Sequence, residues 1–156
     1  MSDDLTRQFG AGAVFALDGD ALPVVVTGTG YPSLDEALGC GGWPVGRIIE
    51  VFGPDPAICR AIALAGMRQV IGSGHPVALV DVEHAMSMEA LIGADMDLAR
   101  VIVSQPGGGE EALEIVEALV RSAAVGMVVV DSVAALVPRD EIDGSEMLGL
   151  AARMMS

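Results

Sequence analysis

Short, continuous apolar segments alternate with longer segments of helical periodicity along most of this chain. The segments 24–27, 47–52, 76–81, 101–104 and 127–131 are rich in valine, isoleucine and leucine. Segments 57–71 and 110–122 carry apolar residues at helical spacing. Strands that are apolar throughout, rather than at every second residue, are typical of a parallel sheet covered on both faces. The pattern therefore predicts an α/β fold in which helices lie on both faces of a parallel sheet.

Local signals predict further elements along the chain. Ser33 follows a proline and precedes Glu36 by three residues, which predicts a capping box at the start of a helix. Glycine and proline predict a loop over 39–46, and we expect helices over 86–92 and 147–156. A chain of 156 residues is long enough for one domain. We expect a single domain over 1–156, with an N-terminal segment and first strand over 1–30 and the α/β core over 31–156.

The formal charge of the chain is strongly negative, at −14, from 22 acidic and 8 basic residues, and every basic residue is an arginine. A field of this sign repels phosphate groups, which disfavours autonomous DNA binding and attachment to an anionic membrane surface. The two cysteines provide neither a disulfide framework nor a metal-binding spacing, and no apolar run is as long as a membrane span. Since the start of the chain shows no secretory signal pattern, we expect a cytoplasmic protein without a metal site.

One segment has the layout of a phosphate-binding loop. In parallel α/β sheets, ligands bind beyond the carboxyl ends of the strands. The segment 53–60 follows the apolar segment 47–52 and precedes a helical one. A phosphate-binding loop has the pattern G-x-x-x-x-G-K-[ST], of which this segment keeps only the first glycine. The residues of this candidate nucleotide site are Gly53, Pro54, Asp55, Pro56, Ala57, Ile58, Cys59 and Arg60.

The side chains of this loop differ from those that grip a triphosphate. Ile58 replaces the second glycine and adds bulk where the backbone must approach a phosphate closely. Cys59 supplies no ammonium group, and Arg60 has no hydroxyl with which to bind Mg²⁺. Pro56 removes one backbone N–H group, and Asp55 adds a negative charge. We therefore expect no tightly bound ATP and interpret the segment as a strand–turn–helix connection packed with side chains.

Two carboxylates follow apolar strands at the same edge of the predicted sheet. Asp131 ends the segment 127–131, a position at which a carboxylate holds Mg²⁺ in nucleotide hydrolases. Glu83 follows the strand that ends at Asp81 and has the chemistry of a general base toward water. Each also has a structural interpretation, Asp131 as a strand-end hydrogen-bond acceptor and Glu83 as a surface carboxylate. Without a phosphate-binding loop beside them, the structural interpretation is favoured for both.

Several longer motifs follow one another from near the start of the chain to its last residue. They are QFGAG at 8–12, SLDEALGCGGWPVGR at 33–47, VDVEHA at 80–85, VVVDSVAALVP at 128–138 and GLAARMMS at 149–156. Together they resemble the bacterial RecA family of recombinases. The resemblance implies a RecA-like P-loop NTPase core that binds ATP and Mg²⁺ and forms filaments on single-stranded DNA. By position it makes Glu83 the water-activating glutamate, Asp131 the aspartate on the Mg²⁺ side, and 53–60 the nucleotide-binding (Walker A) loop.

Several segments depart from the pattern of the family that this chain resembles. The Walker A loop is degenerate, Ala90 stands where the family has a residue that stacks on adenine, and the first DNA-binding loop, at 142–149, is short and acidic. The strand that lies between the two nucleotide-site strands in the family has no counterpart, so we expect a core that is incomplete on its C-terminal side. Unpaired strand edges expose backbone groups that need partners, which predicts self-association.

We therefore expect a RecA-like pseudo-ATPase that is a non-catalytic interaction or regulatory module in DNA repair and recombination. Glu83 is then a vestigial catalytic position, and no cofactor is expected, although the resemblance implies ATP and Mg²⁺. The expected partner is a protein or a second copy of the chain. The alternatives are an active ATP-dependent recombinase subunit that binds single-stranded DNA through an unusual P-loop, a remnant without a dedicated role, and a small-molecule binder near Ile58 and Cys59.

Overall fold

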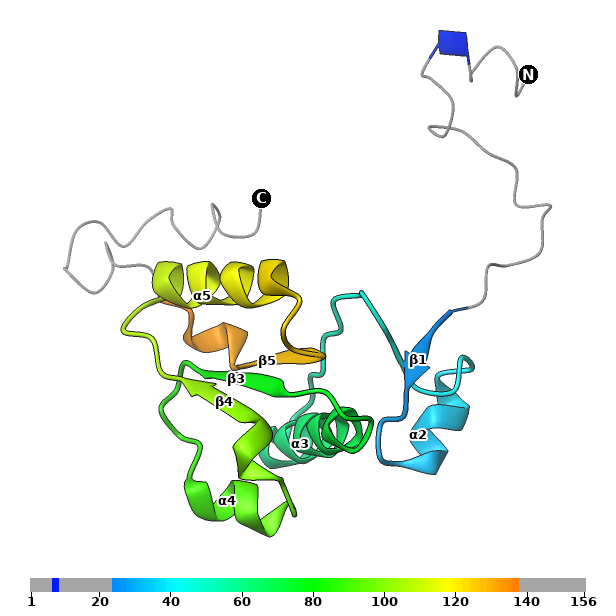
Figure 1. Cartoon of the computed structure of the whole chain (residues 1–156), viewed down its shortest axis with the longest axis horizontal. Coiled ribbons are helices and arrows are strands. Elements are labelled where there is room, and N and C mark those ends of the chain that lie inside the picture. The colour runs from blue at the N-terminus through cyan, green and yellow to red at the C-terminus, as the bar shows by residue number, and fades with distance from the viewer. Residues whose placement is uncertain (1–6, 9–23, 138–156) are drawn as a thin grey trace.

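A three-stranded parallel sheet forms the centre of the described structure. The computed structural model describes residues 7–8 and 24–137 (Figure 1). Within them, β3 (Val77–Asp81) lies between β4 (Val101–Ser104) and β5 (Met127–Asp131) and is parallel to both. The register places Asp81 beside Asp131 at the carboxyl ends of their strands. The parallel α/β fold predicted from the continuous apolar segments is confirmed.

Helices cover both faces of this sheet, as predicted (Figure 1). α3 (Pro56–Gly72) and α4 (Met88–Gly93) lie on one face, and α5 (Gly109–Ser122) lies on the other. Every residue of β3 is buried between them. The main hydrophobic core is aliphatic and lies on the α3 side, where it consists of Leu64, Met67, Val70, Val77, Leu79, Leu91 and Met96.

A two-stranded antiparallel sheet precedes α3. It pairs β1 (Val26–Thr27) with β2 (Trp43–Pro44), and α2 (Pro32–Ala37) lies between these strands in the sequence. The Trp43 side chain is buried against α3 at Gly66, where an added Cβ atom would come within 2.7 Å of the indole nitrogen. Glycine at position 66 therefore lets the small sheet approach α3 closely.

Both ends of α3 follow from local chemistry. The Asp55 carboxylate caps the first turn, and Pro56 occupies a position where its missing N–H group is not needed. Gly74, two residues beyond the end of the helix, has φ = +96°, a left-handed conformation that glycine adopts without strain. Single-turn 3₁₀ helices precede β4, at η1 (Leu98–Arg100), and follow β5, at η2 (Val133–Ala135).

The strand predicted over 47–52 is not formed. These residues are exposed and belong to no strand, and the exposed fractions of Ile48 and Phe52 are 103% and 83%. A strand needs a hydrogen-bonded neighbour for its backbone. Among the described residues, β3, β4 and β5 pair only with one another, and β1 pairs only with β2. An apolar, β-branched composition is therefore insufficient to make this segment a strand.

The capping box predicted at Ser33 is also wrong. α2 begins one residue earlier, at Pro32, with Tyr31 as its N-cap and without a side-chain cap. Proline is pre-organised for the first helical position, which explains the earlier start. The carboxylate of Asp35 instead accepts a hydrogen bond from the backbone N–H of Thr29, with an N···O distance of 2.8 Å.

Most of the other predicted elements agree with the structure to within one or two residues. The strands predicted over 101–104 and 127–131 match β4 and β5, and the helices predicted over 57–71 and 110–122 correspond to α3 and α5. The helix predicted over 147–156 and the DNA-binding loop predicted at 142–149 lie outside the described residues. In residues 7–8 and 24–137, no helix combines the length and the apolar character needed to cross a bilayer.

Candidate functional site

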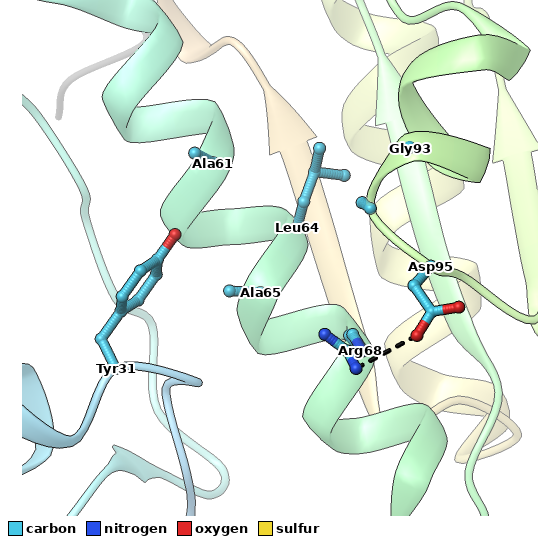
Figure 2. Close-up of a pocket in the computed structure, with 8 residues that line it drawn as sticks. Tyr31, Ala61, Leu64, Ala65, Arg68, Gly93 and Asp95 are labelled. Atoms are coloured by element: carbon cyan, nitrogen blue, oxygen red, sulfur yellow. Dashed lines mark ion pairs between the residues drawn. The ribbon is translucent and has the colours of Figure 1, made fainter.

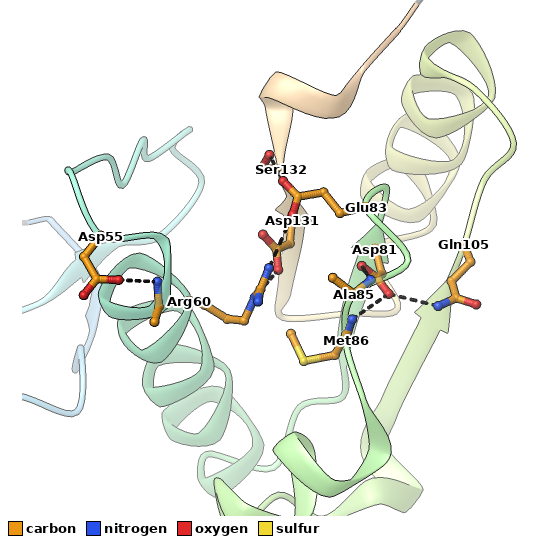
Figure 3. Close-up of polar contacts among 10 residues, drawn as sticks. Asp55, Arg60, Asp81, Glu83, Ala85, Met86, Gln105, Asp131 and Ser132 are labelled. Atoms are coloured by element: carbon orange, nitrogen blue, oxygen red, sulfur yellow. Dashed lines mark hydrogen bonds and ion pairs between the residues drawn. The ribbon is translucent and has the colours of Figure 1, made fainter.

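The carboxyl ends of β3 and β5 bring most of the predicted site residues together (Figure 3). Asp81 and Asp131 end these two neighbouring strands, and Glu83 follows β3 by two residues. The start of α3 faces them, and the segment 53–60 leads into this helix and forms its first residues. The topology of a parallel sheet thus places residues from distant parts of the sequence at one edge, as expected for a ligand site in this fold class.

Arg60 links the start of α3 to two of the three carboxylates at this edge, those of Asp131 and Glu83. Its Nε atom donates a hydrogen bond to Oδ2 of Asp131 at 2.6 Å, and one terminal nitrogen lies 3.6 Å from Oε2 of Glu83. Glu83 is held from its other side, because Ser132 Oγ donates a hydrogen bond to Oε1 at 2.5 Å. Arg60, Asp131, Glu83 and Ser132 form a connected polar group, which we call the Arg60 cluster.

The electrostatics of the Arg60 cluster favour a permanently charged guanidinium. The side chains of Arg60 and Asp131 are 28% and 17% exposed, so their ion pair is only partly screened by water. The hydrogen bond to Asp131 is the largest influence on the pKa of Arg60 and, with the negative charges of Asp131, Glu83 and Asp81, raises it above the ordinary value despite partial desolvation. The cluster therefore carries two carboxylates around one fixed cation.

The backbone at the start of α3 already has an anionic partner. Oδ1 of Asp55 accepts a hydrogen bond from the N–H of Ala57 at 2.9 Å, and Pro56 has no N–H to offer. Residues 53–58 are exposed, with Ile58 at 59%. The expectation that side chains pack this connection is therefore wrong for residues 53–58, whereas Cys59 and Arg60 are half-buried.

Asp81 anchors the turn that positions Glu83. The Asp81 side chain is fully buried and accepts hydrogen bonds from the backbone N–H groups of Ala85 and Met86, both at 3.1 Å, and from the side-chain amide of Gln105 at 2.9 Å. Burial by itself would raise the pKa of Asp81. The hydrogen bonds from Gln105, Met86 and Ala85, together with the charge of His84, outweigh burial and lower it.

A shallow open cavity of about 360 Å³ lies along the middle of α3, away from the Arg60 cluster (Figure 2). Tyr31 lies on one side of the helix, and Gly93 and Asp95 lie on the other. Its charged lining residues, Arg68 and Asp95, pair with each other at 3.1 Å. None of the predicted site residues lines this cavity.

The pairing of Arg60 with Asp131 and Glu83 is the feature that the sequence interpretation missed. From the sequence alone, Arg60 indicates only the loss of a hydroxyl, and Asp131 and Glu83 are separate strand-end carboxylates. A signal was present, since a cation stood at the helix position that faces two predicted strand-end carboxylates.

Within the described residues, no group of three or more histidine, cysteine, aspartate or glutamate side chains is arranged to hold a metal ion.

Comparison with known proteins gives consistent matches over almost the whole chain. The RecA N-terminal domain family matches residues 2–156. The protein RecA of Streptomyces ambofaciens is 47% identical over 156 residues, which cover 97% of this chain and 42% of the relative. Protein RecA of Chloroherpeton thalassium is 45% identical over 158 residues, covering 99% of this chain and 44% of the relative. Protein RecA of Staphylococcus aureus is 46% identical, covering 98% and 45%.

The chain spans less than half the length of these curated relatives. The family match nevertheless runs over residues 2–156, and the described residues have the parallel α/β sheet that the apolar segments predict. This chain therefore belongs to the RecA family and corresponds to the family's N-terminal domain.

Proposed function

We propose that this RecA-family chain is a non-catalytic interaction or regulatory module in DNA recombination and repair and that it does not turn over ATP. The observation that carries this proposal is the carboxylate of Asp55 at the N-terminus of α3. It occupies the end of the helix at which a phosphate-binding loop would hold a nucleotide.

The N-terminus of a helix binds phosphate because its first N–H groups lack partners and the helix dipole favours negative charge. Here Asp55 satisfies the N–H of Ala57 with a negative charge of its own, and Pro56 contributes no N–H. A triphosphate would have to displace the carboxylate or lie beside it. The negative charges of Asp55 and the triphosphate would then repel each other, and the chain has no lysine to offset this repulsion.

The neighbouring positions support the same proposal. Ile58 and Cys59 stand where the family pattern has glycine and lysine, so the loop lacks both the close backbone approach and the ammonium group of a phosphate-binding loop. Arg60 stands where a hydroxyl would ligate Mg²⁺, and its guanidinium contacts Asp131 instead. The residues present therefore do not fit the ATP and Mg²⁺ that the family implies.

Exposed apolar residues favour an interaction role. Segment 47–52 carries Ile48 and Phe52 at high exposure, and β5 has only β3 as a neighbour among the described strands. Exposed strand edges and large apolar side chains are typical of surfaces that bind another polypeptide. We propose that the chain binds a second copy of itself or another protein there, and the net charge of −14 disfavours DNA binding without such a partner. Light scattering after size exclusion tests self-association, and a stable monomer at micromolar concentration would contradict it.

Calorimetric titration with Mg²⁺-ATP tests the nucleotide part of the proposal. The full chain is expected to give no saturable heat at micromolar concentrations. The matched variant is Asp55→Asn, because asparagine caps a helix about as well as aspartate but carries no charge. A small gain in ATP affinity in this variant would agree with repulsion by Asp55. Micromolar binding by the unmodified chain, with hydrolysis stimulated by single-stranded DNA, would support the alternative of an active recombinase subunit.

A further inference from the structure

We propose that the guanidinium of Arg60 takes the place of a divalent cation between Asp131 and Glu83, so that the Arg60 cluster excludes metal ions. This inference deepens the proposed non-catalytic role, on which it rests, by stating what occupies the same site. In addition, the carboxylates of Asp131 and Glu83 serve an ion pair within the chain rather than a metal site.

The contacts of the cluster carry the inference. Arg60 approaches Asp131 Oδ2 at 2.6 Å through Nε and Glu83 Oε2 at 3.6 Å through a terminal nitrogen. The same cation thus reaches both carboxylates, which come from different strand ends. Ser132 Oγ holds the second oxygen of Glu83 at 2.5 Å. Three of the oxygens that could turn toward a metal are therefore already engaged within the chain.

The chemistry of a guanidinium makes this arrangement persistent. Arginine does not lose its proton in proteins, so it remains a cation at every pH at which the two carboxylates are ionised. Mg²⁺ needs a near-octahedral shell of oxygen ligands at about 2.0–2.1 Å, and a cation already held against the same oxygens opposes its entry by charge and by volume. Arg60 lies within the first two turns of α3, a helix whose start is fixed by the Asp55 cap.

The test is the binding of Mn²⁺, used as a spectroscopic probe without nucleotide, to the full chain and to variants. Arg60→Ser shortens the side chain and restores a hydroxyl at this position. The matched control is Arg68→Ser, which removes an arginine of the same helix whose ion pair, with Asp95, lies outside the cluster. Bound Mn²⁺ is counted by electron paramagnetic resonance, and thermal unfolding is followed by the fluorescence of the single tryptophan, Trp43.

We expect Arg60→Ser to bind Mn²⁺ about tenfold more tightly or better than the unmodified chain and to unfold at a higher temperature when Mn²⁺ is added, because a ligand of the native state stabilises it. The unmodified chain and Arg68→Ser should show neither effect. Adding Asp131→Asn to Arg60→Ser should abolish the gain. If Arg60→Ser does not fold without metal, Arg60→Gln, which keeps most of the length but not the charge, takes its place in the comparison.

Two results would overturn the inference. One is Mn²⁺ binding by the unmodified chain that equals that of Arg60→Ser and is lost in Asp131→Asn. The other is the absence of any gain in Mn²⁺ binding in both Arg60→Ser and Arg60→Gln. Because no nucleotide is present, these results are distinguishable from a failure of the proposed function, which would appear as Mg²⁺-ATP binding to the unmodified chain.

Discussion

Arg60 and Asp131 are 71 positions apart in the sequence, and their side chains meet with Nε 2.6 Å from Oδ2. The contact connects the start of α3 with the end of β5, and Glu83 joins it from the neighbouring strand end. The residues next to Arg60 and Asp131 in the sequence do not explain why these two side chains meet. It exists because a parallel sheet gathers strand ends at one edge and α3 begins at that edge.

We predict that Arg60→Ala lowers the free energy of unfolding by about 1.5–3 kcal/mol, the range for hydrogen bonds to charged groups, because it leaves Asp131 partly buried without its cation. Arg68→Ala is the control, since its ion pair with Asp95 is largely exposed and should contribute less than about 1 kcal/mol. Urea unfolding followed by Trp43 fluorescence measures both. Equal losses in the two variants would show that the Arg60 ion pair contributes no more to stability than the exposed Arg68 ion pair.

We predict that Asp55→Ala destabilises the protein by about 1 kcal/mol, because the N–H of Ala57 loses its acceptor at the start of α3. Asp55→Ser, which can still cap the helix, should recover most of this loss. Thermal unfolding by circular dichroism reports the difference. Unchanged stability in the alanine variant would mean that water replaces the cap at no cost.

Asp81 should make stability depend on pH in the acidic range. Its pKa is lowered in the folded state, so its contribution is fully present above the pKa of the unfolded chain, about 3.9, and is lost as pH falls through the lower native value. Asp81→Asn should reduce the free energy of unfolding by about 1–3 kcal/mol at pH 7, because the backbone N–H groups of Ala85 and Met86 lose an anionic acceptor. The difference in the free energy of unfolding between the unmodified chain and Asp81→Asn should narrow below about pH 4. A difference that stays constant from pH 7 to pH 2 would contradict a lowered pKa of Asp81 in the folded state.

Met67 lies at the centre of the core on the α3 side, with a fully buried side chain. We predict that Met67→Ala lowers the free energy of unfolding by about 2–5 kcal/mol, through lost burial and the cavity left behind. Met88, which is 59% exposed on α4, provides the control, and Met88→Ala should change stability by less than about 0.5 kcal/mol. Denaturant titration separates the two cases, and similar losses in both would place the core elsewhere.

Local sequence patterns predicted most of the helices and strands. The helix α3 was predicted over 57–71 from its apolar spacing, and β5 from an unbroken run of apolar residues, but the cap at Asp55 became evident only in the structure. The same reasoning failed at 47–52, where the residue types favour a strand but the described structure offers no neighbour. It failed at Ser33 because Pro32 starts the helix one residue earlier. Whether a strand forms depends on the presence of a pairing partner, and where a helix starts depends on which of several adjacent residues is best suited to the first turn. Composition alone reveals neither.

The amino-acid sequence by itself determined the fold class and the family, since apolar periodicity and ordered motifs are properties of the chain that need no coordinates. It also determined which chemical groups the nucleotide loop lacks. Only the tertiary structure decided that Arg60 faces Asp131 and Glu83, that Asp81 is buried under three hydrogen bonds, and that residues 53–58 of the loop are exposed. The physical reason is that charge pairing and burial depend on distances between residues far apart in the chain, and these distances are set by how the strands and helices pack.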